Sequence, residues 1–69
     1  MKKELIKKIE DYCGNSQFPY KVYFSEVVPD CRYLKYKYFF KYYNTHKVAQ
    51  AFKTQKEIEK FLDNEGYKI

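Results

Sequence analysis

The chain of 69 residues is poor in several residue types, with no Trp, two Gly, two Pro, one Arg, one His and two Cys. No apolar run approaches the roughly 18 residues that a membrane-spanning helix needs. Cys13 and Cys31 are too few for a disulfide-rich scaffold, and no secretory apolar region precedes them. We therefore expect reduced thiols in a cytoplasmic protein.

The same scarcity argues against common kinds of active site. One His and two widely spaced Cys do not match zinc-ligand spacing. His46 has no nucleophile or carboxylate partner at a local spacing, so we interpret it as a turn residue. The four acids of the last segment do not converge on a partner; they are Glu57, Glu59, Asp63 and Glu65. The sequence thus predicts a protein that is not an enzyme, with no metal and no cofactor.

Positive charge and aromatic rings are abundant, and both are concentrated. Residues 31–56 hold six Lys, one Arg and the His, with no Asp or Glu, although the whole chain carries a net charge of only +5. Nine Tyr and six Phe can build a core in one small domain, because a Tyr ring packs while its hydroxyl stays in water. A surface with one sign of charge attracts polyanions.

Spacing and turn residues predict a single α+β domain over residues 1–69 in the order α-β-β-β-α. We expect a three-stranded antiparallel sheet with both helices packed on one face. The apolar positions give two helices and the β-forming runs give three strands. The expected elements are a helix over 2–13, strands over 20–28, 32–43 and 47–53, and a helix over 55–65.

The element ends have recognisable signals. Gly14-Asn15 is expected to end the first helix in the left-handed conformation, and Gly66 the last. Pro29-Asp30 and Asn44-Thr45-His46 are expected as turns. Thr54 and Glu57 fit a capping box at the start of the last helix, and Tyr67 is expected to fold back on Leu62.

Alternation within the strands predicts which side chains face the helices and which face solvent. In the first strand, Val22, Phe24 and Val28 are expected inward, and Lys21, Tyr23 and Ser25 outward. In the long strand, the expected inward set is Leu34, Tyr36, Tyr38, Phe40 and Tyr42. The expected outward set is Tyr33, Lys35, Lys37, Phe39, Lys41 and Tyr43.

The third strand is less clear, because Val48 and Phe52 share a face with Gln50. This leaves Lys47, Ala49, Ala51 and Lys53 outward. A bulge near Phe39-Phe40 would reverse the alternation beyond it.

An open sheet face with these residues has what a phosphate backbone requires, namely mobile cations with flat rings between them. Lys gives mainly non-specific attraction, because its ammonium is a point charge. We therefore predict a duplex nucleic-acid-binding protein, with DNA slightly preferred because the charge lies on the sheet. The predicted binding residues are Lys21, Tyr23, Lys35, Lys37, Phe39, Lys41, Lys47, Lys53 and Lys56.

Four features are spread along nearly the whole chain: a short first helix ending Tyr12-Cys13, Pro19-Tyr20 before the first strand, the Pro29-Asp30 turn, and 52–58 leading into the last helix. In these features the chain resembles a double-stranded RNA-binding domain. The resemblance implies RNA contacts from that turn and from Lys53 and Lys56.

Residues 33–66 are also similar to the arm-type DNA-binding domains of phage and transposon tyrosine recombinases. These domains have three strands followed by one helix, and the similar stretch is the join between strand and helix, Ala51-Phe-Lys-Thr-Gln-Lys-Glu-Ile-Glu-Lys-Phe-Leu62. This resemblance implies a sheet face laid into the major groove, in a small regulator of a mobile element.

An alternative function uses the Tyr-rich face to bind protein. Tyr is favoured at interfaces because its ring offers a large area at little cost in side-chain entropy. A small phage-type inhibitor or adaptor would bind a host or defence protein, such as a CRISPR nuclease. Such an interface would depend on Tyr33, Phe39 or Tyr43 more than on the lysines.

Overall fold

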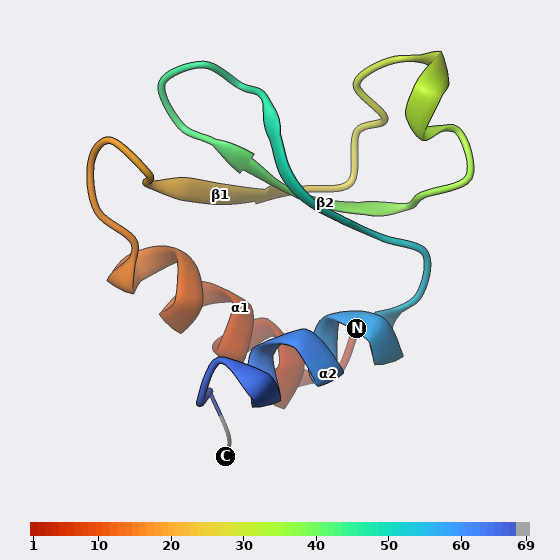
Figure 1. Cartoon of the computed structure of the whole chain (residues 1–69). Coiled ribbons are helices and arrows are strands. Elements are labelled where there is room, and N and C mark those ends of the chain that lie inside the picture. Colours follow the sequence, from red (N-terminus) through yellow and green to blue (C-terminus); the bar gives the residue numbers. More distant parts are fainter. Residues whose placement is uncertain (68–69) are drawn as a thin grey trace.

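Two helices and three strands follow one another in the predicted order in the computed structural model, which describes residues 1–67 (Figure 1). The elements are α1 (Lys3–Asn15), β1 (Val22–Ser25), β2 (Tyr38–Tyr42), β3 (Val48–Phe52) and α2 (Gln55–Asn64). The strands form one antiparallel sheet in the order β1-β2-β3. The predicted α+β domain is confirmed.

Both helices lie on one side of the sheet, as predicted (Figure 1). They bury apolar side chains of α1 and α2 against those of the three strands. This helix-side core consists of Leu5, Ile9, Val22, Phe40, Phe52, Ile58 and Leu62. Phe24, Tyr38 and Tyr42 pack against it, so the inward faces of the first two strands were predicted correctly from Val22 to Phe24 and from Tyr38 to Tyr42. Val28 is an exception, because β1 ends at Ser25 and Val28 lies partly exposed in the following connection.

A bulge interrupts the pairing of β2 with β3. Phe40 pairs with Gln50 and Lys41 pairs with Val48, so Ala49 is the additional residue. A bulge was expected in the long strand near Phe39-Phe40, but the extra residue lies in β3. The alternation of β2 therefore continues through Tyr42, and it is the alternation of β3 that is reversed at Val48 and Ala49. Directly paired residues share a face of the sheet, so Val48 lies on the side of Lys41, and Ala49 packs against the helix-side core. The predicted inward Val48 and outward Ala49 were therefore wrong.

The predicted strand over 32–43 is too long by seven residues, six at its start and one at its end. Residues 31–33 form a short 3₁₀ turn, η1 (Cys31–Tyr33), and β2 begins only at Tyr38. The Asp30 carboxylate accepts a hydrogen bond from the Arg32 amide at 2.9 Å. The Tyr33 amide donates to the Asp30 carbonyl at 3.1 Å, and the Tyr36 amide donates to the Tyr33 carbonyl at 3.0 Å. These local bonds replace the strand pairing that an extended 32–37 would need.

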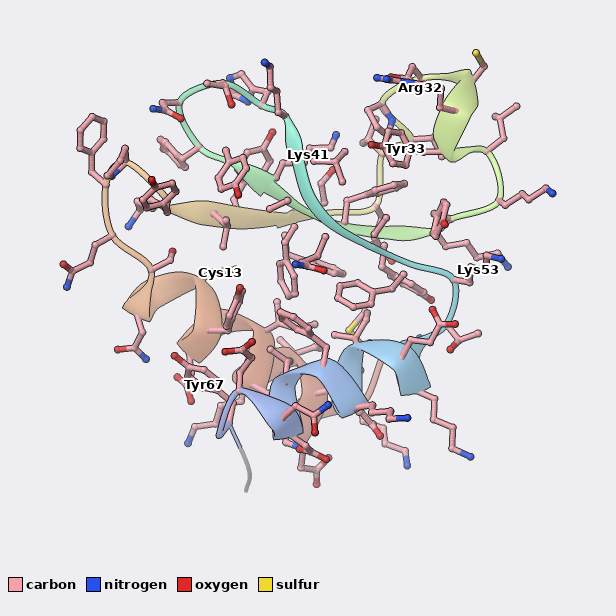
Figure 2. All side chains as sticks on the ribbon, in the orientation of Figure 1. Cys13, Arg32, Tyr33, Lys41, Lys53 and Tyr67 are labelled. Atoms are coloured by element: carbon pink, nitrogen blue, oxygen red, sulfur yellow. The ribbon has the colours of Figure 1, made fainter. Side chains whose placement is uncertain are left out.

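The connection from β1 to β2 covers the sheet face that was expected to be open. Phe39 is fully buried there, and the Tyr33 ring meets it edge-on at 5.9 Å between centroids. Lys41 is only 7% exposed, and its Nζ donates to the Val27 carbonyl at 3.1 Å. Figure 2 shows Tyr33 and Lys41 on the side of the sheet away from the helices. The prediction that Phe39 and Lys41 face solvent was wrong, because this side is a second small core.

The signals at the start and end of α2 were interpreted correctly. The Thr54 hydroxyl accepts from the Glu57 amide at 3.2 Å, and the Glu57 carboxylate accepts from the Lys53 amide at 2.7 Å, one residue earlier than in a standard capping box. Gly66 has φ +92°, and the Tyr67 amide donates to the Leu62 carbonyl at 2.9 Å. This is the Schellman arrangement.

The end of α1 differs from the prediction. The helix continues through Gly14 to Asn15, and Ser16 is the capping residue in an extended conformation. The Ser16 hydroxyl donates to the Cys13 carbonyl and accepts from the Val22 amide. A serine bridge between helix and strand thus replaces the left-handed glycine that was expected.

The contribution of the second core to the free energy of unfolding can be measured. We expect Phe39→Ala to lower the free energy of unfolding by about 3 kcal/mol, as for a fully buried Phe, measured by denaturant titration. Leu34→Ala is the matched control, because Leu34 is 72% exposed in the same covering connection, and we expect a change within about 0.5 kcal/mol. A Phe39→Ala cost as small as the control's would show that this face is open.

Candidate nucleic-acid interface

The net positive charge belongs to the sheet and its connections, and not to the helices. Residues 16–53 contain seven Lys and Arg against two acids, whereas residues 1–15 and 54–67 together contain six Lys against seven acids. Any site for an anionic partner should therefore involve the sheet layer.

The structure separates the nine predicted binding residues into three classes. Six lysines are exposed: Lys21, Lys35, Lys37, Lys47, Lys53 and Lys56. Tyr23 is half-buried, and Phe39 and Lys41 are buried. The Lys41 ammonium lies 5.8 Å from the Phe39 ring centroid and is held by a carbonyl. Neither Phe39 nor Lys41 can contact a nucleic acid in this fold.

Four of the exposed lysines gather where β2 begins and β3 ends. The Lys37 amide donates to the Phe52 carbonyl at 2.9 Å, which brings the chain before β2 beside the chain that enters α2. Lys53 follows Phe52, and its Nζ lies 5.5 Å from the Tyr36 ring centroid. Lys35 precedes Tyr36, and Lys56 lies in the first turn of α2. We call Lys35, Lys37, Lys53 and Lys56 the basic end.

Within the described residues 1–67, no carboxylate forms an ion pair with these four ammonium groups. Among residues 1–67, the ion pairs are Lys8 with Asp63 at 3.1 Å and Arg32 with Asp30 at 2.9 Å. The nearest acid in sequence, Glu57, accepts from the Lys53 backbone amide. The ammonium groups of the basic end are therefore available to an external anion.

Arg32 belongs to a different arrangement. Its guanidinium donates two hydrogen bonds to Asp30, at 3.2 and 2.9 Å, and these hold the pKa of the Asp30 carboxyl below its ordinary value of 3.8. The pair lies at a pocket of about 440 Å³ between η1 and the β2–β3 turn. The lining residues are Pro29, Asp30, Arg32, Tyr33, His46, Lys47 and Val48. Because Asp30 neutralises Arg32, the only bidentate donor of the chain is occupied.

Lys21 and Lys47 lie at the opposite end of β2. The Tyr43 amide donates to the Lys21 carbonyl at 2.7 Å, and the Tyr42 amide donates to the Lys47 carbonyl at 2.8 Å. His46 has φ 59° in the β2–β3 turn, which confirms the turn predicted there. The Tyr23 hydroxyl and His46 Nδ1 are hydrogen-bonded at 2.9 Å. The six exposed lysines thus form two groups and not the continuous face that alternation predicted.

Exposure also divides the residues expected for a protein interface. Phe39 is buried and Tyr33 is half-buried against it, but Tyr43 is 60% exposed. The sequence reasoning missed Tyr36, whose ring meets Lys53, and it missed the exposed Phe18 and Tyr20 before β1. The alternation of Lys and Tyr over 35–38 was the signal in the sequence that could have identified Tyr36 as a partner of the lysines.

Cys13 and Cys31 are not bonded to each other in this structure. Cys13 is partly buried against the helix-side core, and this burial raises the pKa of its thiol above the ordinary 9.0, with a smaller opposing effect from Lys21. Cys31 is exposed in η1.

Two further properties concern the part of the chain that the structure describes. Over residues 1–67, no three His, Cys, Asp or Glu side chains converge as metal ligands. None of the helices in this range combines the length and the apolar character needed to cross a bilayer.

No family model, curated protein or solved structure matches this chain. The function must therefore be argued from the geometry above.

The two thiols are expected to react at different rates. With an aromatic disulfide reagent at pH 8, Cys31 should react in a fast phase and Cys13 in a slow one, because only the thiolate is reactive and burial disfavours it. In the Cys31→Ser variant the fast phase should disappear and only the slow phase should remain. A fast phase that survives Cys31→Ser would contradict the burial of Cys13.

Proposed function

We propose that this protein binds duplex nucleic acid, without enzymatic activity, through the basic end. The observation that carries the proposal is that two adjacent segments, the chain before β2 and the β3–α2 junction, carry four exposed lysines with no carboxylate of residues 1–67 paired to them. Four point charges on one surface suit a phosphate backbone, whose neutralisation releases condensed counterions.

The chemistry of these residues sets the kind of recognition. Lysine holds phosphates but does not read a base edge as a bidentate arginine does, and the one arginine is paired with Asp30. Contacts of this kind position a protein on a duplex without specifying its sequence. We therefore expect weak sequence preference and a steep dependence on salt.

The proposal names duplex nucleic acid in general. A preference for DNA depended on a cationic sheet face, and that face is covered by the β1–β2 connection. The basic end includes Lys53 and Lys56, the positions at which the resemblance to double-stranded RNA-binding domains implies contacts. The two unpaired thiols suit a reducing compartment, so we place this function in the cytoplasm.

The salt dependence of binding tests the proposal. We expect the slope of log K against log salt concentration to be about −3.5 for four phosphate contacts. Lys37→Gln/Lys53→Gln should bring the slope to about −2, because each lost contact removes about 0.9. The measurement is fluorescence anisotropy of labelled blunt duplex DNA and duplex RNA, titrated at several salt concentrations.

Two controls make the result specific to the basic end. Lys2→Gln/Lys3→Gln makes the same change in net charge at the exposed start of α1 and should leave the slope unchanged. Lys41→Met removes the buried ammonium and should also leave it unchanged. If the Lys2/Lys3 and Lys37/Lys53 variants reduce the salt slope equally, the effect depends only on net charge. That result would contradict the proposal.

A further inference from the structure

A second group of side chains lies at the other end of β2. Phe18 is 81% exposed, Tyr20 is 72% exposed and Tyr43 is 60% exposed, although large aromatic residues are usually mostly buried. With Tyr42, which is half-buried, they form what we call the aromatic end. The helix-side core does not use Phe18, Tyr20 or Tyr43.

The rings of the aromatic end are positioned by the sheet. Tyr42 is the last residue of β2, and the Tyr20 ring lies 6.4 Å from the Tyr42 ring between centroids. Tyr43 meets the Tyr23 ring edge-on at 5.9 Å, and Tyr23 is fixed by its hydrogen bond to His46. Tyr43 therefore has a supported orientation while most of its surface faces solvent.

A shallow groove of about 240 Å³ opens beside two of these rings, those of Tyr20 and Tyr42. Its lining residues are Pro19, Tyr20, Tyr42, Asn44 and Thr45. Ring faces and a proline form its apolar walls, while Asn44 and Thr45 contribute an amide and a hydroxyl that can donate and accept hydrogen bonds. Flat apolar walls with a few adaptable polar groups suit a flat, polar-edged ligand.

The charged side chains on the segments that build the aromatic end are all positive. Backbone hydrogen bonds place Lys21 beside Tyr43 and Lys47 beside Tyr42. Residues 16–25 and 38–53, which build this end, contain no Asp or Glu. An anionic partner that also offers flat rings is complementary to both properties, and an unpaired nucleic-acid strand has both.

We propose that the aromatic end stacks on unpaired bases, with Lys21 and Lys47 holding the phosphates that flank them. This inference rests on the proposed function and deepens it, because the basic end would hold the duplex while the aromatic end takes a single-stranded extension. The favoured ligand is then a duplex with an unpaired tail, such as a junction or a frayed end, and not a blunt duplex.

The experiment compares three fluorescent DNA ligands that share one duplex: blunt, with an oligo-thymidine tail, and with an abasic tail of equal length. The two tails carry the same phosphates, so their difference reports the bases alone. We expect the thymidine tail to bind about tenfold more tightly than the abasic tail, as for one well-stacked base. Phe18→Ala/Tyr43→Ala should abolish this difference and leave the affinity for the blunt duplex unchanged.

Two further variants separate stacking from other causes. Tyr43→Phe keeps the ring and should keep most of the tenfold difference, whereas Leu34→Ala, which removes an exposed apolar side chain outside the aromatic end, should keep all of it. Equal binding of the thymidine and abasic tails would overturn the inference. The inference would also be overturned if the wild-type chain self-associates and Phe18→Ala/Tyr43→Ala abolishes this self-association. A second copy of the chain would then cover the exposed rings.

The outcomes also distinguish this inference from the proposed function. If Lys37→Gln/Lys53→Gln leaves blunt-duplex binding unchanged, the proposed role of the basic end is wrong, but the proposed role of the aromatic end is not affected. If the thymidine and abasic tails bind equally, or if their difference does not depend on the rings, the proposed role of the aromatic end is wrong, but that of the basic end is not affected.

Discussion

The fold depends on two adjacent phenylalanines that point to opposite faces of the central strand. Phe39 and Phe40 both have no exposed surface, although neighbours in a strand must face opposite sides. The sheet therefore needs cover on both faces. The helices cover Phe40, and the β1–β2 connection covers Phe39 through the Tyr33 ring.

This double cover determines where charge can lie. Lys41 follows Phe39 on the same face, so it is buried with it and its ammonium bonds to the Val27 carbonyl. The remaining lysines of the sheet layer lie toward the two ends of β2, and Arg32 lies in η1, paired with Asp30. One end has lysines around Tyr36, and the other has Lys21 and Lys47 beside exposed rings. Proposed binding to duplex and to unpaired bases follows from this division.

Local signals in the sequence were sufficient for most of the fold. Helical spacing, the Thr54 cap and Gly66 depend on residues within one or two turns of each other, and they were interpreted correctly. Alternation identified the helix-side residues of β2 correctly over 38–42, but the bulge at Ala49 made it wrong at Val48 and Ala49 of β3. It failed over 32–37, where Lys and Tyr also alternate, because Asp30 starts a turn whose hydrogen bonds are local. The burial of Lys41 could not be predicted from its strand, since the cover comes from residues fourteen positions earlier.

The central claim is that anions meet the ends of the sheet and not its face. The direct measurement is a titration of the isotope-labelled protein with a blunt duplex, followed by backbone amide NMR shifts. The account predicts the largest shifts at Lys35, Lys37, Lys53 and Lys56, with little change at Phe39 and Lys41. Largest shifts at Phe39 and Lys41 would mean that the β1–β2 connection opens and that the sheet face binds, which contradicts the account.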